Sequence, residues 1–317
     1  MKGSPLRTSV PNLPTSRTVI VRPSAKINLT LHVGPKRDDG YHDLRTLLQS
    51  ITLHDTLTIS ARRGPFGLAC HMPGVPSDRS NLVWRAADVL WEAMGQTGAP
   101  RDAHIKLEKV IPSQAGLGGG SADAAAALVG LNTVWGARRS RRDLMRLGAL
   151  IGSDVPFCLQ GGTALGAARG EELYPVDDTH RMGVVVIKPS FGVSTAEAYG
   201  WLDEDRKASV TADAAAARPD ASHPRDVEIG WPSGALALSN DLMAPVSRRH
   251  PEIGEMVAAC LAQGAVAAQM SGSGSAVFAL FAETGAARAA RQLKRPDWLV
   301  LVSRTQTRRE AARSMGL

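Results

Sequence analysis

The sequence predicts an α+β fold, because strand patterns outnumber helical patterns in the first half of the chain. The elements also do not follow the regular strand–helix alternation that a doubly wound parallel sheet requires. With 317 residues, the chain is long for one domain and suits two. We place the boundary near Val176, which gives domains over residues 1–176 and 177–317.

Strands are expected wherever apolar and polar residues alternate or β-branched residues gather. The expected strands are residues 18–22, 25–33, 46–51, 56–61 and 104–110, then 183–187, 265–271, 276–281 and 299–304. Within residues 25–33, the alternation puts Lys26 and Asn28 side by side on the polar face.

Helices are expected where apolar residues recur with a helical period. The expected helices are residues 82–94, 142–151 and 251–263, with an alanine-rich helix after residue 121 and a short helix at the C-terminus. Residues 203–221 contain little apolar content beyond alanine and are expected to form a mobile insertion. Residues 1–17 lack the apolar core of a secretory signal and are expected to be a disordered tail.

Composition restricts the classes of function. The chain has no apolar run of 18 residues, so no membrane partner is expected. Three widely spaced cysteines argue against a disulfide framework or a zinc site and favour the cytoplasm. The net charge of +7 suits an anionic ligand. Only 4% of the residues are aromatic and none interrupts the basic run 138–142, which argues against a nucleic-acid partner.

The most informative segment is glycine-rich and lies between an expected strand and the alanine-rich helix. Its residues are Pro112, Ser113, Gln114, Ala115, Gly116, Leu117, Gly118, Gly119, Gly120, Ser121 and Ala122. Glycines expose backbone N–H groups without a Cβ that would keep an anion away. A helix N-terminus adds further N–H groups and favours negative charge. The segment therefore predicts a site for a phosphate chain.

This loop differs from better-known phosphate-binding motifs. A Walker loop requires Gly-Lys, which occurs nowhere in the chain. A dinucleotide-binding fingerprint requires a third glycine where Ser121 stands. The signature motifs of protein kinases are also missing.

Two residues could supply chemistry to a bound phosphate. Phosphoryl transfer needs a group that orients the acceptor hydroxyl and a cation that stabilises developing charge. Asp154 follows the helix-breaking Gly152, and its local sequence fits a helix cap or turn equally well. Lys26 lies on the polar face of its strand, where a solvated surface lysine is the simpler interpretation. Neither residue is persuasive alone.

Several short motifs connect these residues to known proteins. They are A-K-I-N-L at 25–29, G-Y-H-D-L at 40–44, I-P at 111–112, G-L-G-G-G-S-A at 116–122, G-S-D-V-P-F at 152–157, G-E-E at 170–172, N-D-L at 240–242 and M-S-G-S-G-S at 270–275. In this order they resemble the superfamily of galactokinase, homoserine kinase, mevalonate kinase and phosphomevalonate kinase. Within it, G-Y-H and G-S-D-V-P-F resemble the family whose substrate is 4-diphosphocytidyl-2-C-methyl-D-erythritol.

The resemblance implies a two-domain small-molecule kinase with a ribosomal-S5-domain-2-like N-terminal domain and a ferredoxin-like C-terminal domain. It implies transfer of the γ-phosphoryl group of ATP to the 2-hydroxyl of that substrate, in the non-mevalonate route to isoprenoids. ATP would be wrapped by residues 112–122. Mg²⁺ is implied by ATP chemistry, in which it bridges β- and γ-oxygens; the sequence identifies no ligands for it.

The resemblance also implies the catalytic roles. Asp154 would take the proton of the acceptor hydroxyl, and Lys26 would keep Asp154 ionised and stabilise the nascent alkoxide. An adjacent ammonium lowers the pKa of a carboxylate, which agrees with these roles. Because the acceptor is a tertiary alcohol, positioning should matter more than early proton removal.

Further residues are implied to bind the cytidine-diphosphate-linked substrate. Tyr41 and His42 would receive the cytosine, since an imidazole beside a tyrosine can stack on a pyrimidine and hydrogen-bond its edge. Tyr199 would lie over the base, with Thr195 four residues before it.

Asn28 and Lys109 are implied to reach the sugar and the diphosphate. The turn 272–275 would lie against the phosphate loop, although an ordinary hairpin turn is as compatible with its sequence. We expect a monomer or weak homodimer.

Two alternatives are considered. The chain could phosphorylate another small alcohol, such as homoserine or mevalonate. It could also be a non-catalytic sensor or nucleic-acid-binding protein that keeps the fold. The presence of both Lys26 and Asp154 argues against the second, since a binding protein needs no base.

Overall fold

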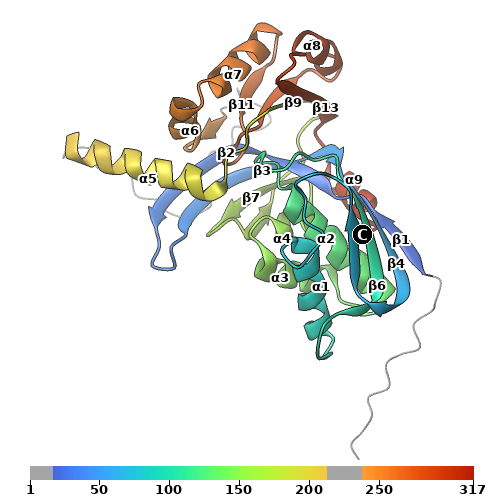
Figure 1. Cartoon of the computed structure of the whole chain (residues 1–317). Helices are drawn as coiled ribbons and strands as arrows, with labels where there is room; N and C mark the ends of the chain where they lie inside the picture. Colours follow the sequence, from blue (N-terminus) through green and yellow to red (C-terminus); the bar gives the residue numbers. More distant parts are fainter. Residues whose placement is uncertain (1–16, 213–237) are drawn as a thin grey trace, which may run out of the picture.

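The computed structural model describes residues 17–212 and 238–317, in which three β-sheets have helices packed around them (Figure 1). Residues 1–16 of the expected tail and 213–221 of the expected insertion lie outside the described residues. Strands β2 (Ser24–Lys36) and β3 (His42–His54) cross the middle of the view, with the helices of residues 82–160 below them and those of residues 243–292 above them.

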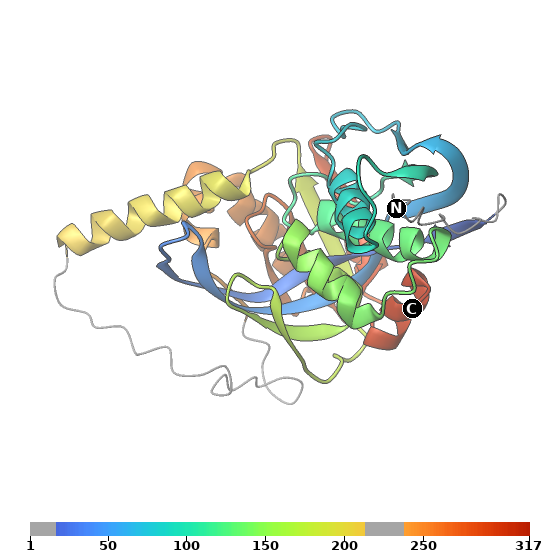
Figure 2. The same cartoon turned by 90° about the horizontal axis from the view of Figure 1, so that it is seen from below.

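Two sheets belong to the N-terminal half. The first has the order β1 (Thr18–Val21), β4 (Thr56–Pro65), β6 (Arg101–Glu108) and β5 (Gly67–Cys70). The second has the order β10 (Ser239–Asn240), β2 (Ser24–Lys36), β3 (His42–His54), β7 (Thr163–Ala167) and β8 (Glu172–Pro175). Helices α1 (Leu82–Ala93), α2 (Gly119–Val134), α3 (Arg141–Ile151) and α4 (Val155–Gln160) lie together beside these sheets in both views (Figures 1 and 2).

Helix α2 forms the centre of this half. It contacts α1, α3 and α4 on one side and strands of both sheets on the other. Because neighbours surround it, its alanines are fully buried, and a Cβ on Gly130 would come within 2.5 Å of the Ile59 side chain. A helix buried on every side needs small residues to let its neighbours approach closely. This explains the alanine-rich sequence after the glycine loop.

The third sheet has the order β11, β12, β9 and β13, and all of its neighbouring strands are antiparallel. Its elements are β9 (Gly183–Pro189), α5 (Thr195–Ala212), α6 (Met243–Arg249), α7 (Glu252–Ala262), β11 (Ala267–Met270), β12 (Val277–Phe281), α8 (Ala286–Gln292) and β13 (Trp298–Arg304). Helix α7 packs on β11 and β12, and α8 packs on β9 and β13. The strand–helix–strand–strand–helix–strand order matches the expected ferredoxin-like domain.

Two elements of the C-terminal half pack against the N-terminal half. Strand β10 pairs in parallel with β2, and helix α9 (Arg308–Met315) packs on α4 and β3. Gln306, just before α9, stabilises this packing. Its side-chain oxygen accepts a 2.6 Å hydrogen bond from Ser24, and its carbonyl accepts one of 2.9 Å from Gln49. The domain boundary near Val176 stays a prediction.

The α+β prediction is confirmed, because only the β2–β10 and β5–β6 pairings are parallel among the described strands. The predicted mobile insertion covered residues 203–221. This prediction is wrong over residues 203–212, which belong to α5. The low apolar content of this segment suggested that it makes no contact with the core. Helix α5 does contact the core, but it needs few apolar residues because it buries only a narrow stripe that includes Ala198 and Leu202. Strand β7 was not predicted, because its glycine-rich sequence is typical of a loop.

We expect Ala126→Leu to destabilise the protein by about 1–3 kcal/mol, because α2 has no room for added methylenes. The measurement is the melting temperature of the purified full chain. Ala287→Leu makes the same change on the exposed face of α8 and should leave the melting temperature nearly unchanged. Equal effects of the two substitutions would contradict tight packing around α2.

Candidate active site

A cavity of about 1000 Å³ opens where the glycine loop, β2, α5 and the turn after β11 meet. Of the predicted site residues, all but Ala122 line this cavity; Ala122 is fully buried in the core instead. This volume is at the upper end for small-molecule sites, so the cavity can hold two ligands side by side.

The glycine loop runs directly into α2. Gly118 is the N-cap residue with φ 71°, a left-handed conformation that favours glycine, and it offers no side chain to the first turn. The N–H of Ala122 already bonds the Gly118 carbonyl at 2.8 Å, but the residues just before it precede the intrahelical ladder. Their N–H groups are therefore available to an anion in the cavity.

A second turn, residues 272–275, packs against this loop, as the family resemblance implied. The Ser271 hydroxyl donates to the Gly116 carbonyl at 2.9 Å, and the Ser275 N–H donates to the Gln114 carbonyl at 3.2 Å. Asn240 holds the turn from behind, since its amide donates to the carbonyls of Met270 and Gly272 at 2.9 and 2.8 Å. Strand β10, which pairs with β2, thus supports the turn that packs on the phosphate loop.

Lys26 and Asp154 face each other in the cavity, with 3.4 Å between the Lys26 ammonium nitrogen and a carboxylate oxygen, and side-chain exposures of 6% and 35%. Lys26 is therefore not the solvated surface lysine that its sequence alone favoured. Asp154 precedes α4 at the N-cap position, but its side chain makes no capping hydrogen bond. Its carboxylate is free to act on a ligand.

This pair lies directly beside the glycine loop. A Cβ on Gly118 would come within 3.0 Å of the Lys26 side chain and 3.6 Å of the Asp154 carboxylate. The Lys26 backbone N–H also donates to the Leu117 carbonyl at 3.0 Å. A phosphate held by the loop and a hydroxyl held at Asp154 would therefore be close enough to react.

Asn28 is fixed by a chain of hydrogen bonds. Its side-chain oxygen accepts from the Lys26 ammonium at 2.7 Å, and its amide donates to the Thr46 hydroxyl at 2.8 Å. Thr46 in turn donates to the Thr30 carbonyl at 2.7 Å. The amide orientation is thereby set, and Lys26 is held on two sides.

Lys109 lies beneath the glycine loop and is bound by two carboxylates, Asp55 at 2.6 Å and Asp123 at 2.8 Å. Burial acts to lower the pKa of Lys109, but the two carboxylates outweigh it and the pKa is raised. Burial is also the main reason that the pKa of Asp123 is well above its usual value. These interactions hold the end of β6 to the first turn of α2; the contact of Lys109 with a ligand stays a prediction.

Another part of the cavity lining is aromatic. Tyr41 is 55% exposed, and the Arg169 guanidinium lies 5.2 Å from its ring centroid. The rings of His42 and Tyr199 are 5.3 Å apart, at a tilt of 35°. Burial raises the pKa of Tyr199, and the charge of Asp154 adds to this effect. The phenol therefore stays neutral.

Thr195 and Tyr199 reach the cavity from α5. The Thr195 hydroxyl lies 3.3 Å from that of Ser273 in the second turn. Asp203 lines the same cavity, 2.9 Å from His42, and was missed because it fell in the expected insertion. Its spacing of four residues from Tyr199 was the available signal, since residues four apart share a helix face.

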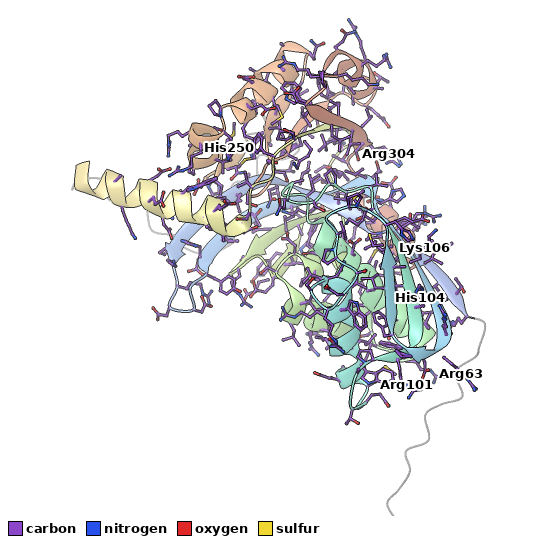
Figure 3. All side chains as sticks on the ribbon, in the orientation of Figure 1. Arg63, Arg101, His104, Lys106, His250 and Arg304 are labelled. Atoms are coloured by element: carbon purple, nitrogen blue, oxygen red, sulfur yellow. The ribbon has the colours of Figure 1, made fainter. Side chains whose placement is uncertain are left out.

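The basic side chains outside the cavity are not gathered around it. Figure 3 shows Arg63, Arg101 and Lys106 on the first sheet, and none of the three is among the residues that line the cavity. Arg101 and Lys106 pair with Asp102 at 3.2 Å and Glu108 at 2.6 Å. Two of these three basic side chains therefore lie beside a carboxylate.

Across the described ranges, no three acidic, histidine or cysteine side chains come together as a metal cluster. Within the same ranges, none of the helices has both the length and the apolar character needed to cross a bilayer.

Sequence comparison places known families in two parts of the chain. The GHMP kinases N terminal domain matches residues 81–162, and the GHMP kinases C terminal domain matches residues 229–296. A protein of Pelotomaculum thermopropionicum named 4-diphosphocytidyl-2-C-methyl-D-erythritol kinase is 43% identical over 284 residues, covering 89% of this chain and 96% of its own length. A protein of the same name from Mycolicibacterium smegmatis is 40% identical over 283 residues, covering 86% of this chain and 84% of its own.

Solved structures agree with these relatives. A crystal structure of 4-(cytidine 5'-diphospho)-2C-methyl-D-erythritol kinase superimposes with a TM-score of 0.72 at 33% identity, covering 90% of this chain and 99% of the other. The mevalonate kinase of L. major in complex with R-mevalonate gives a TM-score of 0.67 at 15% identity, covering 92% and 97%. This second likeness shows a shared fold.

We expect Gly116→Ala to raise the KM for the phosphate-bearing nucleotide about tenfold or more, because the new Cβ would lie 1.9 Å from the Ser271 carbonyl and push the two turns apart. Steady-state kinetics at varied nucleotide concentration give this value.

Gly264→Ala is the matched control, since Gly264 also has a left-handed backbone, φ +84°, but nothing lies within 4 Å of its Cβ position. The Gly264→Ala variant should therefore show only the effect of placing alanine in a left-handed backbone conformation, without a steric clash. The contact between the two turns would be unimportant if both variants changed the KM equally.

Proposed function

The chain belongs to the 4-diphosphocytidyl-2-C-methyl-D-erythritol kinase family of the GHMP kinases, and on this basis we propose that it transfers the γ-phosphoryl group of ATP to the 2-hydroxyl of 4-diphosphocytidyl-2-C-methyl-D-erythritol. The observation that carries the proposal is the Lys26–Asp154 pair beside the glycine loop. With this acceptor, the proposed role is the supply of isoprenoid precursors through the non-mevalonate route.

The reaction would proceed between these groups. The acceptor hydroxyl donates a hydrogen bond to Asp154, and its oxygen forms the new bond to the γ-phosphorus as the bond to the ADP oxygen breaks. The proton passes to the Asp154 carboxylate, and the Lys26 ammonium stabilises the charge on the acceptor oxygen. Because Lys26 is held by Asn28 and by Asp154 itself, both catalytic groups are in place before the substrates bind.

ATP would occupy the side of the cavity formed by residues 112–121, with its phosphates against the N-terminus of α2. Mg²⁺ supplies charge neutralisation between the β- and γ-phosphates when it is bound. Magnesium usually keeps several waters and takes few protein ligands, which fits a cavity where no acidic cluster is found among the described residues. We assign no protein ligand to it.

The cytidine end of the acceptor substrate would lie among Tyr41, His42 and Tyr199, where aromatic rings face the cavity. Aromatic rings bind a base by stacking, and the imidazole can hydrogen-bond its edge. Asn28 lines the same cavity and is bonded to Lys26, which supports its proposed contact with the sugar. For Lys109 we keep the proposed contact with the diphosphate, made from beneath the loop.

The setting of the protein is proposed from simple features. Cys70, Cys158 and Cys260 are all free thiols, which supports the cytoplasm as the compartment. The proposed partners are small molecules, and we propose a monomer or weak homodimer.

A coupled assay of ADP release tests the function. The full chain is supplied with ATP, Mg²⁺ and 4-diphosphocytidyl-2-C-methyl-D-erythritol, and separately with homoserine or mevalonate. Turnover with the first acceptor alone is the expected result. Turnover only with another alcohol, or none beside an active control enzyme, would refute the proposal.

We expect Asp154→Asn to lower kcat by on the order of 10²- to 10⁴-fold, since the amide cannot accept the hydroxyl proton. The KM for ATP should change little, because the carboxylate contacts the acceptor rather than the loop-bound phosphates. Initial-rate kinetics with both substrates measure the effect. A loss of less than tenfold would make Asp154 a structural residue.

We expect Tyr41→Ala, His42→Ala and Tyr199→Ala each to raise the KM for the acceptor substrate about tenfold or more, because each removes a stacking surface or hydrogen bond. The KM for ATP should stay nearly constant. Tyr174→Ala removes an exposed tyrosine outside the cavity lining and serves as the control. Unchanged KM values in all three variants would exclude a cytidine site here.

A further inference from the structure

Asp203 lines the cavity beside Tyr199 and His42, and its carboxylate contacts the imidazole ring of His42. One of its carboxylate oxygens is 2.9 Å from Nε2 of His42, whose side chain is 5% exposed. The other oxygen is 3.7 Å from the Lys36 ammonium. The carboxylate therefore already has a cation beside it, and the imidazole need not be charged to balance it.

A carboxylate can only accept a hydrogen bond, so the hydrogen between the two groups belongs to Nε2. In a neutral imidazole the other nitrogen, Nδ1, then carries a lone pair and can only accept. The contact with Asp203 thus determines what kind of hydrogen bond His42 offers to a ligand.

Helix α5 is held firmly enough to place Asp203 there. Arg206, one turn further along, donates to the Gly34 carbonyl in the β2–β3 hairpin at 3.0 Å. Glu204 pairs with Arg249 of α6 at 2.7 Å. Figures 1 and 2 both show α5 lying across the end of this hairpin. Since His42 begins β3 and Asp203 lies on α5, the contact joins the two domains at the cavity.

An acceptor at this position distinguishes the pyrimidine bases. Cytosine carries an exocyclic amino group, which donates, whereas uracil carries a carbonyl oxygen at the same place, which only accepts. Nδ1 would therefore accept a hydrogen bond from the cytosine amino group. With uracil, two acceptors would face each other, and no hydrogen bond could form. A site that leaves a polar group unpaired rejects the wrong ligand more strongly than a small change in shape does.

We propose that Asp203 is a positioning residue that holds His42 as the Nε2–H tautomer and so makes the site selective for a cytosine over a uracil nucleotide. This inference rests on the proposed function, because it takes the acceptor substrate to carry a cytidine diphosphate. Asp203 acts through His42 and need not contact the base.

The tautomer is tested first, without any activity measurement. Long-range ¹H–¹⁵N correlation spectra of the full chain, labelled with ¹⁵N, distinguish the Nε2–H, Nδ1–H and doubly protonated forms of each histidine. The signals of His42 are identified by their loss in His42→Gln. The Nε2–H form is expected at neutral pH. The Nδ1–H form or a doubly protonated ring would overturn the proposal.

Selectivity is tested second, with the cytidine-diphosphate-linked substrate and its uridine-diphosphate-linked analogue. In Asp203→Asn the amide can donate to Nε2, which allows the other tautomer. We expect the ratio of kcat/KM values for the two substrates to fall by about 10- to 100-fold, mainly through KM, with kcat for the cytidine substrate nearly unchanged. Glu255→Gln, which makes a carboxylate-to-amide change on the exposed face of α7 and outside the cavity lining, is the control and should keep the ratio.

The outcomes separate the two hypotheses. An unchanged ratio in a folded Asp203→Asn variant refutes the role of Asp203, even if the enzyme phosphorylates the cytidine substrate well. Absence of any turnover by the unsubstituted chain refutes the proposed function instead, while the spectra still decide the tautomer. Asp203→Ala, which removes the acceptor altogether, gives a second variant if the asparagine variant does not fold.

Discussion

The buried ammonium of Lys26 is the interaction on which the rest of the site depends. A charged group this deeply placed must be compensated, and it has an amide oxygen on one side and a carboxylate on the other. These partners come from β2 itself and from the residue before α4. The backbone of Lys26 also bonds the glycine loop. One residue thereby fixes the distance between the loop and the carboxylate, the geometry that in-line transfer requires.

Close approach between backbones is the second constraint. Gly116 contacts the Ser271 carbonyl where no Cβ would fit, and a Cβ on Gly118 would come within 3.0 Å of the Lys26 side chain. The alanines of α2 serve the same end inside the core, because they let the sheets and helices pack tightly around the helix whose N-terminus faces the cavity. Small residues in this protein therefore allow backbone groups to approach one another and the cavity closely, and the larger side chains around them supply the chemistry.

The two domains share the site rather than merely adjoin it. The N-terminal half supplies the loop, Lys26 and Asp154, while Thr195, Tyr199 and the second turn come from the C-terminal half. Strand β10 and helix α9 anchor one half on the other, so these contributions are held in register. Such an arrangement suits an enzyme with two substrates, since each can be gripped by a different set of elements in a common cavity.

The sequence alone determined the α+β class, most of the strands, the glycine loop at a helix start and the motifs that place the chain in its family. These features are local, and spacing along the chain records them. Tertiary structure alone decided that Lys26 is buried, that Asp203 reaches His42 across 161 residues of sequence, and that Lys109 is shared by Asp55 and Asp123. Helix α5 illustrates the reason. Its sequence has too little apolar content to predict a core helix, and it is held by ion pairs and backbone contacts to elements far away in the chain, which no local pattern can encode.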